Sequence, residues 1–224
     1  MPSTMIHNEI IEKIGRLGIV PVLAIEEVKA ALPLADALLE GGLPIVEITF
    51  RTAAAAEVIR TLACERPALL VGAGTVLTRA NLQAAKAAGA RFCVAPGLNP
   101  DTAREARDMG LPFIPGVATP SEIEQALSLG CATLKFFPAE PMGGVEMLNA
   151  LGAPYGHTGV KFVPTGGVTP ANLESYLACK VVAAVGGTWL AKKEDLAAGN
   201  WPEIRRRCEA AVQTVSRVRA AAKK

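Results

Sequence analysis

The sequence predicts an α/β fold, and more specifically an eight-stranded (β/α)8 barrel of the TIM type. The first observation is that eight short apolar runs alternate with alanine-rich helical stretches. The second is that helical stretches end in glycine and lead directly into an apolar run, as in "LLEGGLPIVEITF", "AAKAAGARFCVAP", "ARDMGLPFIPGV" and "ALSLGCATLKFF". Glycine commonly ends a helix, and a short, wholly apolar run is typical of a parallel strand covered by helices. Eight such units favour a closed barrel over an open sheet.

The predicted elements follow one another regularly. A short N-terminal helix is expected around residues 6–17. The strands are predicted at 19–24, 45–50, 68–73, 91–95, 113–117, 132–137, 161–165 and 181–186. Helix start signals with Thr, Asn or Ser, often beside proline, follow several of them, in "VLTRANL", "GLNPDTA", "VATPSEI" and "GVTPANL". No linker interrupts the 224 residues, so we expect one domain over residues 1–224.

Composition narrows the classes of function. The net charge of +2 is too balanced to indicate a nucleic-acid or membrane partner. Five cysteines without C-x-x-C spacing indicate free thiols in a reducing compartment. No signal peptide and no apolar run of membrane-spanning length is present, so we expect a soluble, cytoplasmic protein. The two histidines, His7 and His157, lack H-x-x-H or H-x-x-x-H spacing, and no metal site is expected.

Two predicted strands each carry a charged residue within an apolar run. Glu47 lies in "IVEITFR" and Lys135 in "ATLKFF". Strand alternation places each charge on the mixed face of its strand, while the wholly apolar face suits packing under helices. The mixed faces then point into the barrel. Because the second and sixth strands of an eight-stranded barrel are opposite each other, Glu47 and Lys135 are expected to meet across the interior.

This pair has two interpretations. It is either a buried ion pair that fixes strand register or a catalytic pair. Both residues lie near the carboxyl ends of their strands, where barrel enzymes place their chemistry. Desolvation lowers the pKa of a lysine, which leaves neutral amine to attack a carbonyl and form a Schiff base, and a buried carboxylate can move the protons. Spacing alone leaves both interpretations open.

Two more polar residues lie at the same predicted rim. Arg51 ends the second strand, where it can either bind a carboxylate through two hydrogen bonds or form a surface arginine at a helix start. Thr75 closes "VGAGT" after the third strand. Glycines there allow a ligand to approach the backbone, although Thr75 can equally be an N-cap.

Two glycine pairs indicate a phosphate site. "VPTGGVTPAN" (163–172) follows the seventh strand and "VGGTWL" (185–190) ends the eighth. Barrels commonly bind phosphate with the loops after strands 7 and 8, using backbone N–H groups and a helix N-terminus. One glycine pair most often marks a turn, whereas two pairs in these consecutive loops predict anion binding.

Seven segments together resemble the KDPG/KHG aldolase family. They occur in the family's order from Ile19 to about Glu203, and "LKFFPAE" and "PTGG" are the more specific of them. The segments are "VEITFR", "VGAGTV", "PGLNPD", "PGVATPSE", "LKFFPAE", "FVPTGGV" and "VGGTWL". Family members are class I pyruvate aldolases that act on 2-keto-3-deoxy-6-phosphogluconate (KDPG) and 4-hydroxy-2-oxoglutarate (KHG).

The resemblance implies a role for each candidate residue. Lys135 would form the Schiff base and Glu47 would be the general acid/base. Arg51 and Thr75 would hold the pyruvyl carboxylate, and Pro96 and Phe137 would line the pocket. The residues at the phosphate-bearing end would be Thr165, Gly166, Gly167, Gly187 and Thr188.

The implied reaction cleaves KDPG to pyruvate and glyceraldehyde 3-phosphate, and also KHG to pyruvate and glyoxylate. No cofactor is expected, because the lysine supplies the electrophile, and the resemblance implies a homotrimer. Three alternatives remain: a 2-keto-3-deoxy-6-phosphogalactonate aldolase, another phosphate-binding barrel isomerase or synthase, and a non-catalytic trimer that binds sugar phosphates.

Overall fold

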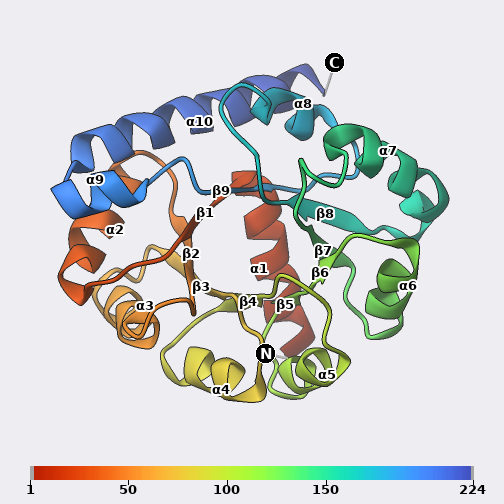
Figure 1. Cartoon of the computed structure of the whole chain (residues 1–224), viewed down its shortest axis with the longest axis horizontal. Helices are drawn as coiled ribbons and strands as arrows, with labels where there is room; N and C mark the ends of the chain where they lie inside the picture. Colours follow the sequence, from red (N-terminus) through yellow and green to blue (C-terminus); the bar gives the residue numbers. More distant parts are fainter. Residues whose placement is uncertain (1–2, 223–224) are drawn as a thin grey trace.

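The computed structural model describes residues 3–222 and has an α/β fold in which helices surround curled parallel sheets (Figure 1). Six strands form one sheet in the order β5-β4-β3-β2-β1-β9, and three form a second in the order β6-β7-β8. The strands are β1 Ile19–Leu23, β2 Ile45–Thr49, β3 Leu70–Gly74, β4 Phe92–Val94, β5 Phe113–Ile114, β6 Gly116–Val117, β7 Thr133–Phe136, β8 Lys161–Pro164 and β9 Val185–Gly187. The parallel α/β architecture predicted from the sequence is therefore confirmed.

The fifth and eighth predicted strands differ from expectation. The segment 113–117 divides into β5 and β6 on either side of Pro115, which has no N–H to donate to a ladder. The strand predicted at 181–186 begins only at Val185. The preceding residues turn instead, with the Val182 amide donating to Cys179 O at 3.0 Å, although Val182 also forms an isolated bridge with Phe162. The half-buried apolar run 181–183 therefore combines a turn with a single bridge to β8 instead of forming a full strand.

The helices lie outside the sheets, and most of the predicted start signals cap them. Thr78, Asn99 and Thr119 each accept backbone hydrogen bonds at a helix N-terminus, and Thr119 forms a capping box with Glu122. The helices are α1 Ser3–Leu17, α2 Ala31–Glu40, α3 Ala55–Glu65, α4 Arg79–Ala87, α5 Pro100–Asp108, α6 Pro120–Ser128, α7 Gly144–Tyr155, α8 Leu173–Ala178, α9 Lys193–Ala198 and α10 Trp201–Ala221, with 3-10 turns η1 Val28–Ala30 and η2 Gly156–Thr158.

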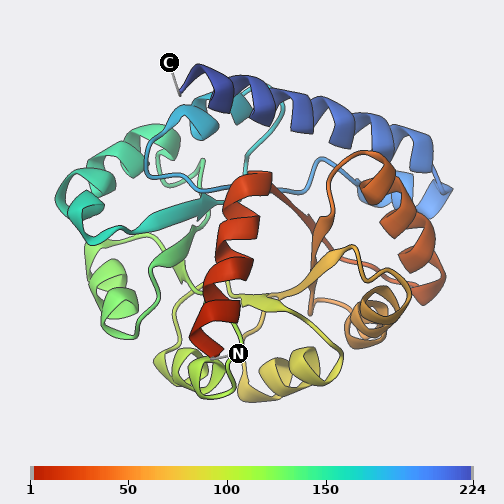
Figure 2. The same cartoon turned by 180° about the vertical axis from the view of Figure 1, so that it is seen from behind.

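Helix α1 covers one end of the sheets (Figure 2). The helix expected around residues 6–17 is confirmed and extends from Ser3 to Leu17. Because β1 starts at Ile19, directly after α1, the covered end is the amino-terminal end of the strands. Ile10 and Ile14 of α1 are buried against the core. The carboxyl ends of the strands, towards which the chain runs past Glu47 in the middle of β2 and Lys135 within β7, are on the opposite side.

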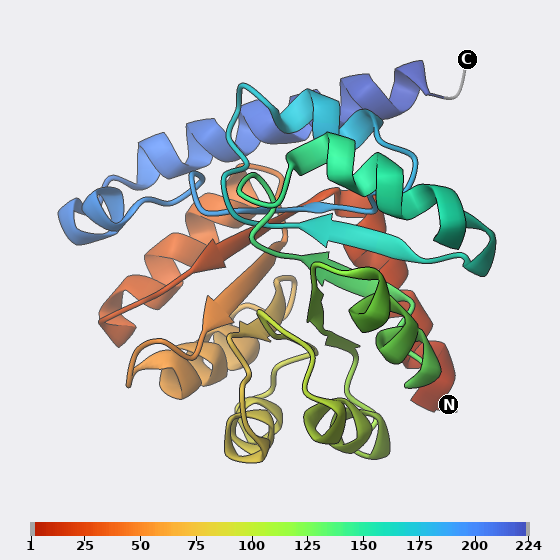
Figure 3. The same cartoon turned by 45° about the vertical axis from the view of Figure 1, so that its right-hand side comes forward.

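The long helix α10 runs along α2 and α8 and returns the chain to α1 (Figure 3). Arg219, in its last turn, donates to Gly15 O and Arg16 O at the end of α1 and to Ala183 O at 2.9 Å, just before β9. Burial lowers the pKa of Arg219. One guanidinium therefore joins three segments at the closed end.

The structure shows where the cysteines and histidines of the sequence lie. All five cysteines lie within the described range and are free thiols; three of them are buried. Within residues 3–222, no helix is long and apolar enough to cross a membrane. The same residues bring together no group of three or more His, Cys, Asp or Glu side chains able to hold a metal ion. His157 lies in η2, whereas the side chain of His7 is outside the described part.

We predict that Arg219→Ala destabilises the fold. The substitution leaves two partly enclosed carbonyl groups, Gly15 O and Ala183 O, and the exposed Arg16 O without their donor, so the free energy of unfolding should fall by about 1–3 kcal/mol. Urea unfolding followed by circular dichroism measures the loss. Arg217→Ala is the matched control, because Arg217 is on the same helix and pairs with Glu174 in solvent; it should change stability by less than about 1 kcal/mol. Equal losses in the two variants would contradict the anchoring role of Arg219.

Candidate active site

A buried lysine and a buried glutamate meet inside the sheets. Glu47 is on β2 and Lys135 on β7. Lys135 Nζ lies 3.8 Å from Glu47 Oε1, and only 7% of the lysine side chain and 4% of the glutamate side chain are exposed. Residues this polar are seldom buried without a partner. The structure thus brings together the two charges that strand alternation directed into the interior.

Glycines lie beside both members of this pair in the neighbouring strands, and one of them, Gly74, makes room for Glu47. Glu47 is level with Gly72 of β3, and Lys135 is level with Gly116 of β6. A Cβ on Gly74, two residues along β3, would lie 2.1 Å from Glu47 Oε1. The sequence interpretation assigned the glycines of "VGAGT" to ligand approach. In the structure Gly74 has a further role, because any side chain there would displace the glutamate carboxylate.

The electrostatics of Glu47 suit proton transfer. Its Oε1 atom is buried and has no hydrogen-bond partner within residues 3–222. Burial raises the pKa of Glu47, while the positive charges of Lys135 and Arg51 oppose the shift. A carboxyl whose pKa moves towards neutrality can accept and return a proton at physiological pH. Lys135 Nζ also lies 5.2 Å from the ring centroid of Phe137, within reach of a cation–π contact.

Arg51 is oriented by a residue that the sequence interpretation did not select. Arg51 Nε donates to Thr49 Oγ1 at 3.0 Å, and Thr49 Oγ1 donates to Leu23 O of β1 at 3.1 Å. Thr49 is buried, whereas Arg51 is exposed beyond the end of β2. The chain of hydrogen bonds fixes the base of the guanidinium and leaves its terminal nitrogens for a ligand. Thr49 could have been selected from the sequence, because strand alternation places it on the same face as Glu47.

Thr75 has an unusual backbone conformation at the end of β3. Its φ angle is +55°, in the left-handed region that side-chain-bearing residues seldom adopt. Such strained residues cluster at functional sites. The N-cap of α4 is Thr78, so Thr75 does not have the capping role that was one of its two interpretations. Thr75 is half-buried beside Gly74.

Phe137 contacts Lys135, and Pro96 lies against Gly116, the strand neighbour of Lys135. A Cβ on Gly116, the strand neighbour of Lys135, would lie 2.0 Å from Pro96 O, so the loop after β4 packs directly on β6. The Phe137 ring follows β7 and would lie 3.4 Å from a Cβ on Gly166. Phe137 therefore extends from the lysine towards the first glycine pair.

The two predicted glycine loops adjoin each other. Thr165, at the end of β8, is buried and bridges to Gly186 of β9. Gly166 and Gly167 have φ angles of +97° and +86°, which favour glycine. The amides of Gly166, Gly167 and Thr188 donate to no acceptor within the described part of the chain.

Gly187 contributes differently from the first glycine pair. It is buried in β9, and a Cβ there would lie 2.5 Å from the Trp189 ring. Its lack of a side chain makes room for Trp189, so substitution would test packing as well as anion binding. Thr188, the next residue, is exposed.

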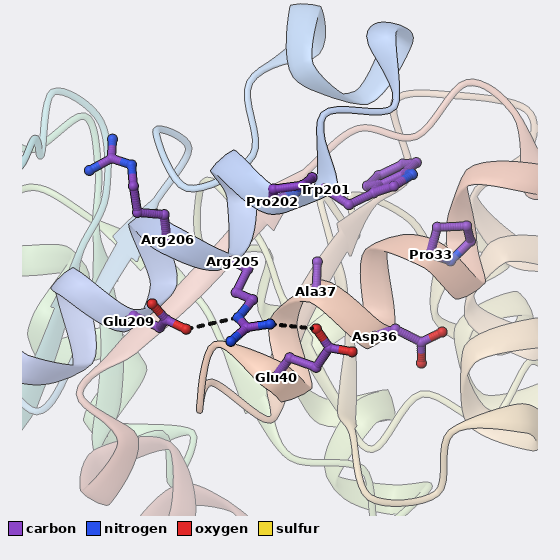
Figure 4. Close-up of a pocket in the computed structure, with 9 residues that line it drawn as sticks. All are labelled: Pro33, Asp36, Ala37, Glu40, Trp201, Pro202, Arg205, Arg206 and Glu209. Atoms are coloured by element: carbon purple, nitrogen blue, oxygen red, sulfur yellow. Dashed lines mark hydrogen bonds and ion pairs between the residues drawn. The ribbon is translucent and has the colours of Figure 1, made fainter.

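A separate surface pocket lies between α2 and α10 (Figure 4). Its nine lining residues include none of the candidate site residues. Arg205 bridges Glu209 of α10 and Glu40 of α2, at 2.8 and 3.2 Å. Exposed ion pairs of this kind contribute little energy and are typical of a solvated face. This pocket is therefore separate from the place where the candidate site residues gather.

Comparison with known proteins first identifies the class: this α/β fold with its buried lysine–glutamate pair is that of an aldolase, a carbon–carbon lyase. Residues 10–207 match the family model described as KDPG and KHG aldolase, and the chain belongs to this family. A 2-dehydro-3-deoxy-phosphogluconate aldolase of Haemophilus influenzae is 46% identical over 199 residues, which are 89% of this chain and 93% of the relative.

Two solved structures of such enzymes are similar over most of their length. The KDPG aldolase of Legionella pneumophila, with pyruvate captured at low pH as a covalent carbinolamine intermediate, is 39% identical with a TM-score of 0.86, covering 90% of this chain and 97% of that one. The 2-keto-3-deoxy-6-phosphogluconate aldolase of Zymomonas mobilis with 3-phosphoglycerate is 38% identical with a TM-score of 0.82, covering 90% and 94%. The family recognised in the sequence motifs is confirmed.

We predict that Gly74→Ala inactivates the enzyme without unfolding it. The new Cβ would occupy the position of Glu47 Oε1 and push the carboxylate out of line with Lys135. Aldol cleavage, measured as pyruvate release, should fall roughly 10²-fold, the lower end of what general acid–base catalysis contributes. Gly156→Ala is the control, because a Cβ there meets nothing within 4 Å. Wild-type turnover in a folded Gly74→Ala protein would contradict this role.

Proposed function

We propose that the chain is a class I pyruvate aldolase that cleaves KDPG to pyruvate and glyceraldehyde 3-phosphate and accepts KHG as a second substrate. The observation that carries this proposal is the buried Lys135 Nζ, which lies 3.8 Å from Glu47 Oε1, an oxygen without a hydrogen-bond partner among residues 3–222. The covalent carbinolamine of the Legionella enzyme supports lysine chemistry in the family. The 3-phosphoglycerate of the Zymomonas enzyme supports a phosphorylated substrate.

The first step forms the imine. Lys135, as the free amine, adds to the C2 ketone through its nitrogen lone pair, and the ketone oxygen becomes the hydroxyl of a carbinolamine. Loss of that hydroxyl as water leaves a protonated imine. Glu47, at ion-pair distance from the nitrogen, is positioned to supply and remove protons in this step.

The second step breaks the C3–C4 bond. Glu47, acting through a water molecule, takes the proton of the C4 hydroxyl, and the bonding electrons flow into the protonated imine to give an enamine and the free aldehyde. Glu47 then returns a proton to C3, and water hydrolyses the imine to release pyruvate and the amine. No net oxidation occurs. The raised pKa of Glu47 suits a group that must hold and give up a proton in each cycle.

The remaining site residues bind the two ends of the substrate. The Arg51 guanidinium, together with Thr75, holds the pyruvyl carboxylate, since arginine forms paired hydrogen bonds to carboxylates. Pro96 and Phe137 line the space beside Lys135. Backbone amides of the Gly166–Gly167 loop and of Thr188, with Thr165 and Gly187 behind them, receive the phosphate, because a concave set of backbone N–H groups binds anions.

We also propose that the chain forms one closed barrel domain and assembles into an oligomer. The two sheets act as a single (β/α)8 barrel in one domain over residues 1–224. The single residue, Pro115, between β5 and β6 and the bridge between Thr165 and Gly186 support this closure. The protein acts as a homotrimer, a proposal that rests on the family resemblance. The family match favours an aldolase over an isomerase, a synthase or a non-catalytic trimer.

Borohydride reduction in the presence of pyruvate tests the mechanism. The imine should be trapped as one reduced pyruvyl group, found by peptide mass spectrometry on the peptide that contains Lys135. Lys161→Arg is the control, because Lys161 is on the adjacent strand β8 but exposed; it should still be labelled. Lys135→Arg should not be labelled.

Labelling combined with a turnover assay distinguishes the role of Glu47 from that of Lys135. Glu47→Gln should still be labelled, while its turnover of KDPG falls by about 10²–10⁴-fold, as expected for loss of a general acid–base group. An adduct at a lysine other than Lys135, or no adduct at all, would refute the proposed imine. Full turnover by Glu47→Gln would reduce Glu47 to a structural ion-pair partner.

We predict that Thr49→Val weakens substrate binding more than turnover. Valine fills the same space but cannot accept from Arg51 Nε, so the guanidinium loses its fixed orientation. A hydrogen bond of about 0.5–1.5 kcal/mol corresponds to a KM for KDPG that rises about two- to tenfold, with a smaller change in kcat. Thr52→Val is the control, because Thr52 Oγ1 donates to Ile25 O at 2.7 Å and not to the Arg51 side chain. An unchanged KM in Thr49→Val would show that Arg51 needs no support.

A further inference from the structure

Glu140 contacts the first glycine loop through both its backbone and its side chain. Ala139 N and Glu140 N donate to Thr165 O and Gly166 O at 2.9 and 3.0 Å. A Cβ on Gly167 would lie 2.4 Å from Glu140 Cγ, so the side chain passes directly over Gly167. The turn after β7 is therefore packed on the loop that we assign to the phosphate.

Tyr176 of α8 holds the end of the Glu140 side chain. The tyrosine is fully buried, and its hydroxyl donates to Glu140 Oε1. A Cβ on Gly144, at the start of α7, would lie 3.0 Å from Glu140 Oε1 and 3.2 Å from the Tyr176 hydroxyl, so α7 also packs on the pair. Burial, and then the hydrogen bond to Glu140, raise the pKa of Tyr176, so the hydroxyl keeps its proton at neutral pH.

Each backbone carbonyl group of the loop accepts a hydrogen bond from a neighbouring segment. In addition to the two bonds from the Glu140 turn, Asn172 Nδ2 donates to Gly167 O at 3.1 Å. Three consecutive carbonyl groups, those of residues 165–167, thus have donors. The amides of Gly166 and Gly167 remain available for an anion.

We propose that Tyr176 and Glu140 form a positioning pair for the phosphate loop, and that this pair sets the preference of the enzyme for phosphorylated over unphosphorylated keto acids. The inference rests on the proposed function. The pair acts in two ways. It packs the Gly166–Gly167 loop in the conformation with free amides, and it ties the Glu140 carboxylate to the tyrosine, away from the anion.

The second effect follows from charge. Glu140 carries a negative charge in contact with the glycine that faces the phosphate. Like charges repel each other, and although Glu140 as a residue is exposed, its bond to the buried Tyr176 hydroxyl holds the carboxylate in one position. Without the tyrosine hydroxyl, the carboxylate can swing over Gly167 and oppose a phosphoryl group. A substrate without phosphate is not affected by that movement.

Tyr176→Phe is the first test, with KDPG and KHG as paired substrates. The variant should raise the KM for KDPG about ten- to hundredfold, the effect of one charge-assisted hydrogen bond, with kcat nearly unchanged. The KM for KHG should stay within about twofold. Tyr155→Phe is a matched control, because Tyr155 donates to Glu124 at 2.9 Å on the surface, away from the loop. It should change neither substrate.

A double variant distinguishes the effect of the Glu140 charge from the effect of loop packing. Glu140→Gln keeps the shape and an acceptor oxygen but removes the negative charge, so the double variant Tyr176→Phe with Glu140→Gln should recover most of the affinity for KDPG. Equal losses on KDPG and KHG in the tyrosine variant, or no recovery in the double variant, would overturn the proposal.

Hydrogen exchange tests the positioning role of the Tyr176–Glu140 pair independently of catalytic activity. The amides of Ala139 and Glu140 donate into the loop, so they should exchange faster in Tyr176→Phe and at the wild-type rate in Tyr155→Phe. Unchanged exchange in Tyr176→Phe would overturn the positioning role. If the wild-type protein cleaved neither keto acid, the proposed function would fail, while faster exchange would still support the pair as the support of this loop.

Discussion

The ion pair between Lys135 and Glu47 imposes the strictest constraint on this structure. Taking two charges out of water costs several kcal/mol for each ion, and their mutual attraction offsets this only when the geometry is held closely. The pair is held by strands rather than by loops, since β2 and β7 each contribute one charge from the middle of a hydrogen-bonded ladder. The fold must therefore keep the register of both sheets to keep the site.

Glycines within the strands make room for polar groups in the interior of the sheets. A glycine within a strand weakens it, because it adds no packing surface and loses more backbone entropy on folding. Gly74, Gly116 and Gly186 nevertheless lie where a Cβ would meet Glu47, the Pro96 carbonyl and Thr165, respectively. The strands give up local stability so that polar side chains and a loop can approach the backbone. Hydrophobic packing outside the sheets, including α1 across the closed end, compensates for the loss.

Much of this arrangement could be predicted from the sequence because it depends on short-range periodicity. Alternation along a strand fixes which residues share a face, and that placed Glu47 and Lys135 in the interior. Capping rules likewise located the starts of α4 and α6. Position within a strand can be predicted without knowing its neighbours, and so these predictions succeeded.

Features that depend on partners distant in the chain could not be predicted. Thr49 supports Arg51 only because Leu23 lies beside it on β1, and Gly74 matters only because the glutamate of the next strand points at it. The strand predicted at 181–186 was displaced for a related reason. Apolar residues at 181–184 are expected both in a full strand and in a turn with a single bridge, and only the hydrogen bonds of residues 179–183 distinguish the two.

The two ends of the site are held by different kinds of structure, and this separates the chemistry from the choice of substrate. Lys135, Glu47 and the base of Arg51 are held by strands, so their positions depend on the strand register. The Gly166–Gly167 loop is fixed by side chains from α8 and from the turn after β7. Such side chains can vary without altering strand register. Substrate preference can therefore diverge within this fold while the bond-breaking step stays the same.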